Sequence, residues 1–309
     1  VSLDGGTIKL DGNYPVGTNN VALGDGALDA ALTGNSNTGI GSFSLTNNTS
    51  GASNTGLGFA ALGDTTTGSF NTGIGTSALE NNTDASYNTA VGYQAGYTNT
   101  TGQVNTYFGY GAGRLNSTGG SNTGIGVSAL DSNTASNNTA IGKDAMAANT
   151  SGASNTAVGA FSLQSNTTAS SNTALGYQAG YTNTTGADNL ALGAYSLLNN
   201  TTASYNTAVG RGAMYTNSTG ADNVALGGQS LVLNSTGSYN TALGRSALYN
   251  NTTASNNTAV GYQAAYNTTT GGTNTALGFQ TLYSNQTGED NSALGHMALN
   301  ANTASTNTA

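Results

Sequence analysis

The sequence contains no cysteine and no tryptophan, and it has a single proline and a single histidine. Without cysteine, neither a disulfide framework nor a thiolate metal site can form. One histidine, His296, leaves almost nothing for acid–base chemistry near neutral pH, and no set of Ser, His and Asp can be argued from it. The carboxylates are scattered along the chain rather than gathered at one point of a motif. We therefore expect no enzyme, no cofactor and no metal site.

Charge is also scarce. Lys, Arg, Asp and Glu make up 6% of the 309 residues, and five basic residues stand against thirteen acidic ones. This balance lacks the basic footprint of a nucleic-acid-binding protein. No apolar run is long enough to span a bilayer, so we expect no membrane insertion. The chain starts at Val1 and stops within a motif, and we interpret it as a segment of something longer.

What the sequence does contain is one motif, Asn-Thr-Ala-Val-Gly and its variants, repeated with a step of seventeen residues. The step shortens to sixteen in two copies, 122–137 and 291–306. A fixed period of this length is typical of a solenoid or a fibre. The opening asparagines lie at positions 20, 37, 54, 71, 88, 105, 122, 138, 155, 172, 189, 206, 223, 240, 257, 274, 291 and 307.

Counted from each opening Asn, the repeat has fixed features. Repeat position 4 is apolar, position 5 is Gly, position 8 is small and position 9 is usually Leu or Met. Gly, Asn and Thr fill most other positions, which disfavours helix. The pattern predicts an all-β fold, a parallel β-solenoid over 20–309 behind a lead-in or cap over 1–19. We expect short strands at positions 2–4 and 7–9, with bends at the glycine and at the Asn-Thr-Thr-Gly turn. The sixteen-residue copies lose a residue in that turn.

Side chains at one repeat position would stack into ladders along the solenoid. We predict an Asn ladder at position 1, apolar ladders at positions 4 and 9, and glycines at position 5 that adopt a positive φ or contact the next coil closely. Two large apolar side chains per coil make a thin core, so we expect chains to associate, most simply as a homotrimer. Representative ladder residues are Asn88, Val91, Gly92, Asn155, Val158, Gly159, Leu175 and Gly176.

Three stretches carry a resemblance to known repeats: Asn19-Asn-Val-Ala-Leu-Gly24, Asp188-Asn-Leu-Ala-Leu-Gly193 and Asp222-Asn-Val-Ala-Leu-Gly227. They resemble the head repeat of YadA-like (haemagglutinin-type) trimeric autotransporter adhesins, whose repeat of about fourteen residues forms a left-handed parallel β-roll in a trimer. The seventeen-residue form, with Tyr-Gln-Ala-Gly-Tyr and Asn-Thr-Thr-Gly, is more similar to repeats of phage tail fibres. The resemblance covers nearly the whole chain and implies architecture more than function.

Tyrosines at repeat positions 6 and 10 are the remaining candidates for a site. In three of these copies position 9 has lost its large side chain, so we expect the rings to fill the gap; the alternative is a weak platform for a receptor glycan. A fourth copy has Tyr at position 6 only. The residues are Tyr93, Tyr97, Tyr177, Tyr181, Tyr262 and Tyr266.

The sequence therefore predicts a structural segment of a phage tail fibre, a rigid trimeric spacer carrying a receptor-binding tip for host attachment. Its partners would be copies of itself, other fibre or tail proteins and a host glycan, on a virion or a cell surface. A bacterial surface adhesin head or stalk is the alternative. A monomeric ice-binding solenoid is another, since Thr recurs at repeat position 2. Val21, Leu190 and Val224 interrupt that Thr rank, which suggests that position 2 is at least partly buried.

Overall fold

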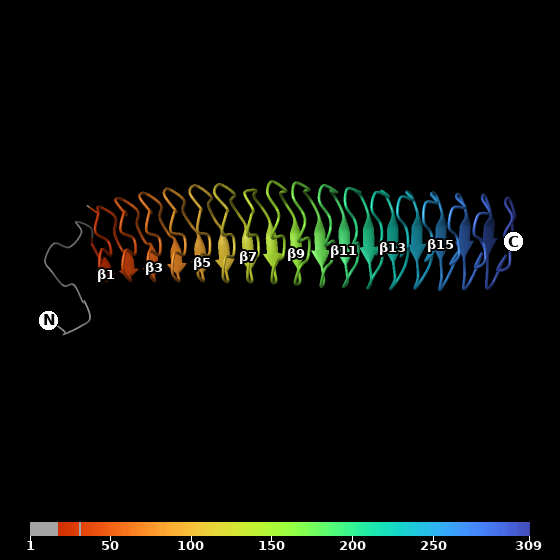
Figure 1. Cartoon of the computed structure of the whole chain (residues 1–309), viewed down its shortest axis with the longest axis horizontal. Helices are drawn as coiled ribbons and strands as arrows, with labels where there is room; N and C mark the ends of the chain where they lie inside the picture. Colours follow the sequence, from red (N-terminus) through yellow and green to blue (C-terminus); the bar gives the residue numbers. More distant parts are fainter. Residues whose placement is uncertain (1–17, 31) are drawn as a thin grey trace. The chain divides into compact units, whose positions relative to one another are not determined.

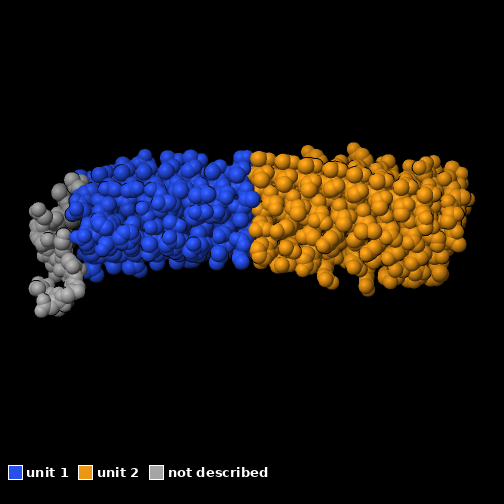
Figure 2. All heavy atoms as spheres, viewed as in Figure 1, with its two compact units in different colours: residues 1–153 blue, residues 154–309 orange. Residues whose placement is uncertain are grey.

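The computed structural model describes residues 18–30 and 32–309. The chain divides into two compact units, unit 1 over 1–153 and unit 2 over 154–309 (Figure 2). Almost all of the expected cap over 1–19 lies outside the described residues. Each unit is a stack of coils, and each coil contributes one three-residue strand (Figure 1).

The strands of a unit pair in parallel with the strands of the coils before and after them. In unit 1 the strands are β1 (Val21–Leu23), β2 (Thr38–Ile40), β3 (Thr55–Leu57), β4 (Thr72–Ile74), β5 (Thr89–Val91), β6 (Thr106–Phe108), β7 (Thr123–Ile125) and β8 (Thr139–Ile141). In unit 2 they are β9 (Thr156–Val158), β10 (Thr173–Leu175), β11 (Leu190–Leu192), β12 (Thr207–Val209), β13 (Val224–Leu226), β14 (Thr241–Leu243), β15 (Thr258–Val260), β16 (Thr275–Leu277) and β17 (Ser292–Leu294).

The register keeps equal repeat positions side by side. Thr89 pairs with Thr106, and Val91 pairs with Phe108. The register also survives the sixteen-residue copy, because Thr123 pairs with Thr139. The carbonyl of Ala135 accepts hydrogen bonds from the amides of Asn122 and Asn133, as the carbonyl at repeat position 15 does in longer coils. The missing residue therefore falls in the turn. The prediction of an all-β parallel β-solenoid is confirmed.

The expected second strand at repeat positions 7–9 is wrong. These residues form a turn in which positions 7 and 9 adopt left-handed backbone conformations, for example Ser77 with φ 56° and Leu79 with φ 51°. Such values are uncommon for residues other than glycine. Their regular recurrence turns the chain so that the side chain at position 9 enters the coil. Leu45, Leu79 and Leu231 are fully buried there, as predicted for this ladder.

The predicted apolar ladder at repeat position 4 does not point into the coil. Side chains alternate along a strand, and the small residue at position 3, such as Ala90 or Ala174, is the buried one. Val91 and Val158 are half-buried, and Leu175 is 43% exposed. The interior already holds the side chains of positions 8 and 9, so only a small residue fits opposite them. The larger apolar side chain faces outward.

Candidate interaction face

In each unit the outward side chains of the strands form a continuous strip, which we call the strand face: repeat positions 2 and 4. Position 2 is Thr in thirteen strands and Val, Leu or Ser in the others, and position 4 is always Leu, Ile, Val or Phe. No charged residue occurs at either position. Position 2 is half-buried or exposed, as are the apolar side chains of position 4. An extended apolar surface of this kind marks an interaction site on a soluble protein.

A glycine with positive φ at repeat position 5 follows every strand, and in most coils it leaves no room for a side chain. Gly92 has φ 136°, and a Cβ atom on it would lie 2.4 Å from the carbonyl oxygen of Gly109 in the next coil. Gly159 has φ 132°, with the same 2.4 Å approach to the oxygen of Gly176. Both expected reasons for glycine, a positive φ and a close contact between coils, hold here. The close approach lets successive strands stack directly on one another.

Two asparagine ladders inside the coils support the strand face. At repeat position 1, the backbone N–H of Asn189 donates to Oδ1 of Asn172 at 3.0 Å, and Nδ2 of Asn172 donates to the carbonyl of Gly186 at 2.9 Å. Asn88 and Asn155 are buried in the same ladder and donate to the carbonyls of Gly102 and Ala169. Most residues of this ladder thus tie a strand to the turn of its own coil and also bond a neighbouring coil.

The second ladder, at repeat position 12, was not foreseen from the sequence. Nδ2 of Asn200 donates to Oδ1 of Asn183 at 2.8 Å in the preceding coil, and Asn217 donates in turn to Asn200 at 3.0 Å. The recurring Asn-Thr and Asn-Ser pairs at positions 12 and 13 are the sequence feature that marks this ladder. They did not predict it, because such pairs are equally typical of surface turns. Buried amides satisfied in this way fix the spacing of the coils.

Thr interrupts the second ladder in each unit. In unit 1, Oδ1 of Asn48 and Oγ1 of the following Thr65 have no hydrogen-bond partner, and Asn251 and Thr268 repeat this defect in unit 2. Threonine lacks the amide that would reach back to the preceding asparagine. The unpaired oxygens therefore follow directly from one residue type.

The six candidate tyrosines do not fill the interior. Tyr177 is 44% exposed, Tyr93 and Tyr262 are similarly exposed, and Tyr97, Tyr181 and Tyr266 are half-buried at the surface. Several instead stack on rings of neighbouring coils. The ring centroid of Tyr93 lies 5.2 Å from that of Tyr110. The ring centroid of Tyr266 lies 5.1 Å from that of Tyr249 and 5.3 Å from that of Tyr283. A ring covered on both faces, such as Tyr266, offers a sugar only its edge.

The interior gap at Gly96 and Gly113 is filled by a different residue, Tyr107. It occupies repeat position 3, where other coils carry Gly or Ala, and its side chain is fully buried. A Cβ on Gly113 would lie 2.3 Å from the ring, and one on Gly96 would lie 3.1 Å from it. Burial raises the pKa of the Tyr107 phenol well above its usual value, and the hydroxyl oxygen has no hydrogen-bond partner.

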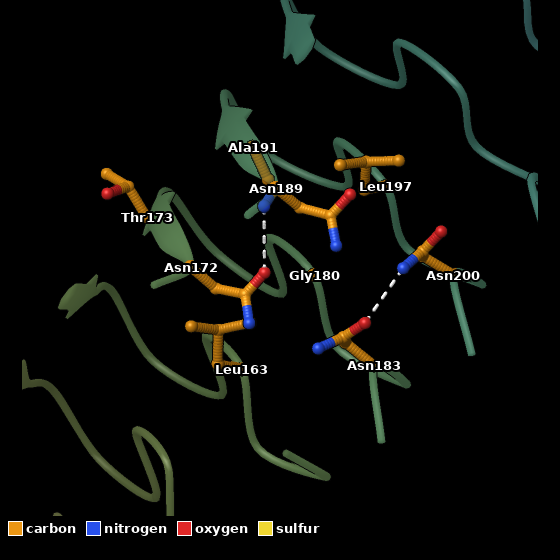
Figure 3. Close-up of a pocket in the computed structure, with 9 residues that line it drawn as sticks. All are labelled: Leu163, Asn172, Thr173, Gly180, Asn183, Asn189, Ala191, Leu197 and Asn200. Carbon is orange, nitrogen blue, oxygen red and sulfur yellow. Dashed lines mark hydrogen bonds between the residues drawn. The ribbon is translucent and has the colours of Figure 1, made fainter. Parts of the chain in front are cut away.

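The gap at Gly180 stays open. A void of about 10 Å³ remains beside this glycine, lined on opposite sides by Leu163 and Leu197 (Figure 3). Its lining also includes Asn172 and Asn189 of one ladder and Asn183 and Asn200 of the other. The volume is about that of one water molecule, so the void is too small for a ligand.

The described residues hold no cluster of His, Asp and Glu that could bind a metal ion, and they contain no helix that could cross a membrane. The Nε of Arg114 pairs with Oδ1 of Asp131 at 2.8 Å across neighbouring coils. That contact raises the pKa of Arg114. It links two turns at the surface and forms no pocket.

Comparison with protein-family models and with curated proteins finds no match to this chain.

Proposed function

We propose that the chain is a spacer segment of a homotrimeric fibre, of the kind found in phage tail fibres, in which copies associate through their strand faces. One observation carries the proposal: the outward strip of Thr and Leu, Ile or Val is free of charge in every strand of both units. A soluble monomer gains nothing from such a surface. An assembly that buries it gains apolar contact in every coil.

The energetics agree with association. A fully buried Leu stabilises by about 1.5–3 kcal/mol, so covering a half-exposed one adds roughly 1 kcal/mol. Each coil contributes one such residue, and the gain accumulates along the stack. Three copies around one axis would pool the exposed strips of narrow coils whose own interior holds only one large apolar side chain.

In this proposal the coils are mechanical. They hold a receptor-binding tip away from a virion, with fibre or tail proteins as neighbours and a host glycan as the target of the tip. No residue in them performs catalysis. A bacterial surface adhesin head or stalk uses the same assembly and is the alternative setting, since both place the segment outside the host cell.

Sedimentation equilibrium of the full chain tests the proposal. The wild type should contain three copies, and replacing Leu175, Leu192 and Leu226 with Ser should dissociate it. A control with Ser at Leu115, Tyr215 and Leu233 has matched exposure (37–40% against 37–43%) but lies outside the strand face. A monomeric wild type, or equal effects of the two sets, would refute the proposal.

A second candidate is favoured by a specific observation: the Thr side chains of repeat position 2 lie outward on the strand face. Regular ranks of outward Thr are what ice-binding solenoids use. Those surfaces usually carry two Thr ranks, whereas here the second rank is Leu, Ile, Val or Phe. An ice binder would be monomeric and would inhibit ice recrystallisation, with loss of this activity when Thr207 and Thr241 are replaced by Tyr. The fibre segment would show neither property.

A further inference from the structure

Unit 2 contains six charged side chains of Lys, Arg, Asp and Glu, and five of them lie at the ends of strands. Asp188, Asp222 and Asp290 each lie two residues before a strand, namely β11, β13 and β17. Arg211 and Arg245 lie two residues after β12 and β14. Acidic residues thus precede strands and basic residues follow them.

Because the strands are parallel, this order places the charges on opposite borders of the strand face. We call the residues at repeat position 17 of unit 2 the start rim and those at repeat position 6 the end rim. The start rim has no basic residue, and the end rim has no acidic one. The remaining charged residue, Glu289, immediately precedes the start-rim residue Asp290.

The two rims cannot neutralise each other within one chain. The two rims lie six positions apart along the chain, which corresponds to at most about 20 Å of backbone. Asp188, Asp222, Arg211 and Arg245 are exposed, and among the described residues none of them forms an ion pair. Each rim is therefore available to another molecule of opposite charge.

We infer that the charged rims pair between neighbouring copies: the start rim of one copy meets the end rim of the next, with Asp222 of one copy facing Arg211 and Arg245 of its neighbour. The inference rests on the self-association proposed above and adds the charged residues through which neighbouring copies meet. The partner is a second copy of this chain, because a single surface supplies both complementary charges.

Symmetry links charge to direction. When copies are related by rotation about an axis along the stack, whether two-fold or three-fold, unlike rims come together. When two strand faces meet with the chains antiparallel, like rims come together, Asp against Asp and Arg against Arg. Like charges across an interface cost several kcal/mol, so the antiparallel arrangement is disfavoured.

The heights of these charges along the stack also fit pairing between neighbouring copies. Asp188 lies at β11, Arg211 at β12, Asp222 at β13 and Arg245 at β14, so the signs alternate coil by coil. In parallel copies at equal height, Asp222 of one copy lies between the levels of Arg211 and Arg245 of its neighbour. Each step is about 4.8 Å, within reach of an arginine side chain.

Charge reversal tests the inference on the full chain. Replacing Arg211 and Arg245 with Asp makes both rims acidic and should weaken self-association at low salt by about tenfold or more, with recovery at high salt. Adding Asp188→Lys and Asp222→Lys should restore it by exchanging the signs. The control carries the same change in net charge on exposed threonines away from the strand face: Thr185, Thr202, Thr219 and Thr236, each replaced by Asp.

Disulfide cross-linking shows which rims of neighbouring copies lie close together. The chain has no cysteine of its own, so any disulfide must join introduced residues. Ser171→Cys places a thiol on the start rim before β10, and Ala194→Cys places one on the end rim after β11. A mixture of the two variants, refolded together, should form the disulfide, and neither variant alone should. A three-copy assembly that is insensitive to charge reversal would overturn the inference while the proposed function stood. A disulfide in either single variant requires like rims to meet, and it would overturn both the inference and the three-fold arrangement. A wild type that sediments as a monomer would overturn both.

Discussion

Two of the regions in which glycine replaces the buried Leu or Met of repeat position 9 differ in what fills the space. In unit 1 the glycines Gly96 and Gly113 leave room for the ring of Tyr107, which enters from repeat position 3. In unit 2, Gly180 leaves a void between Leu163 and Leu197, and position 3 of the same coil is Ala174. A large side chain at one repeat position can therefore replace one that is missing at another position, but this does not happen in every coil.

The largest effect should come from emptying the filled region. Tyr107→Ala removes the whole ring from a fully buried site and should destabilise unit 1 by about 3–5 kcal/mol, measured by denaturant unfolding. Tyr205→Ala is the control, because Tyr205 is exposed at the surface of its coil. Similar small losses for both variants would contradict the assignment of Tyr107 as the filling residue.

Leu at Gly96 and Gly113 should compete with Tyr107 for the same interior space. Adding Leu at Gly96 and Gly113 to the wild type overpacks the interior against Tyr107 and should cost about 1–3 kcal/mol. The same two substitutions in the Tyr107→Ala chain restore the usual coil and should stabilise it. Leu is compatible with the backbone, since φ is 61° at Gly96 and 51° at Leu79 in the preceding coil. If the two substitutions changed the free energy of unfolding in the same direction with and without the Tyr107 ring, competition for one interior space would not explain the effect.

Restoring a missing hydrogen bond in the interior should stabilise a unit, and removing one should destabilise it. Thr65→Asn supplies the amide that Asn48 lacks and should stabilise unit 1 by about 1 kcal/mol. Asn200→Thr makes the reverse change in an intact part of the ladder and should cost about 1–3 kcal/mol. Thermal unfolding of the two variants should shift in opposite directions; shifts in the same direction would refute a pairing effect.

The smallest effect should come from filling the open void. Gly180→Leu restores the side chain that most other coils have at this position, and φ of 61° at Gly180 is close to the values that Leu adopts elsewhere. The end of the Leu163 side chain, which lies 2.9 Å from the new Cβ, must move aside. We expect a gain of about 1 kcal/mol, near one methyl group's worth of cavity. A lower free energy of unfolding for Gly180→Leu would show that the Leu163 side chain cannot move aside.

Much of the fold follows from the sequence because the repeat samples every environment many times. The period sets the coil, the invariant Gly of position 5 marks a contact that excludes Cβ, and the Leu of position 9 points inward. The direction of the strand residues does not follow. A three-residue strand alternates its faces, and hydrophobicity alone favoured Val91 over Ala90 for the interior, although the structure buries Ala90.

The remaining errors have physical reasons of the same kind. Left-handed backbone at Leu79 or Gln94 cannot be foreseen from residue type, because the conformation is imposed by closing the coil. Tyr177 was assigned to a gap by its nearness in sequence, whereas the residue that fills such a gap in unit 1, Tyr107, comes from the opposite wall. Packing across a coil links positions that a linear pattern does not.

Hydroxyl-radical footprinting of the assembled wild type tests the central claim, that the strand face is covered by other copies. Leu175, Leu192 and Leu226 are as exposed in one chain as Leu115 and Leu233, which lie on another face. We predict that the first three are protected from oxidation and that the other two react. Equal oxidation of both groups would show that other copies do not cover the strand face.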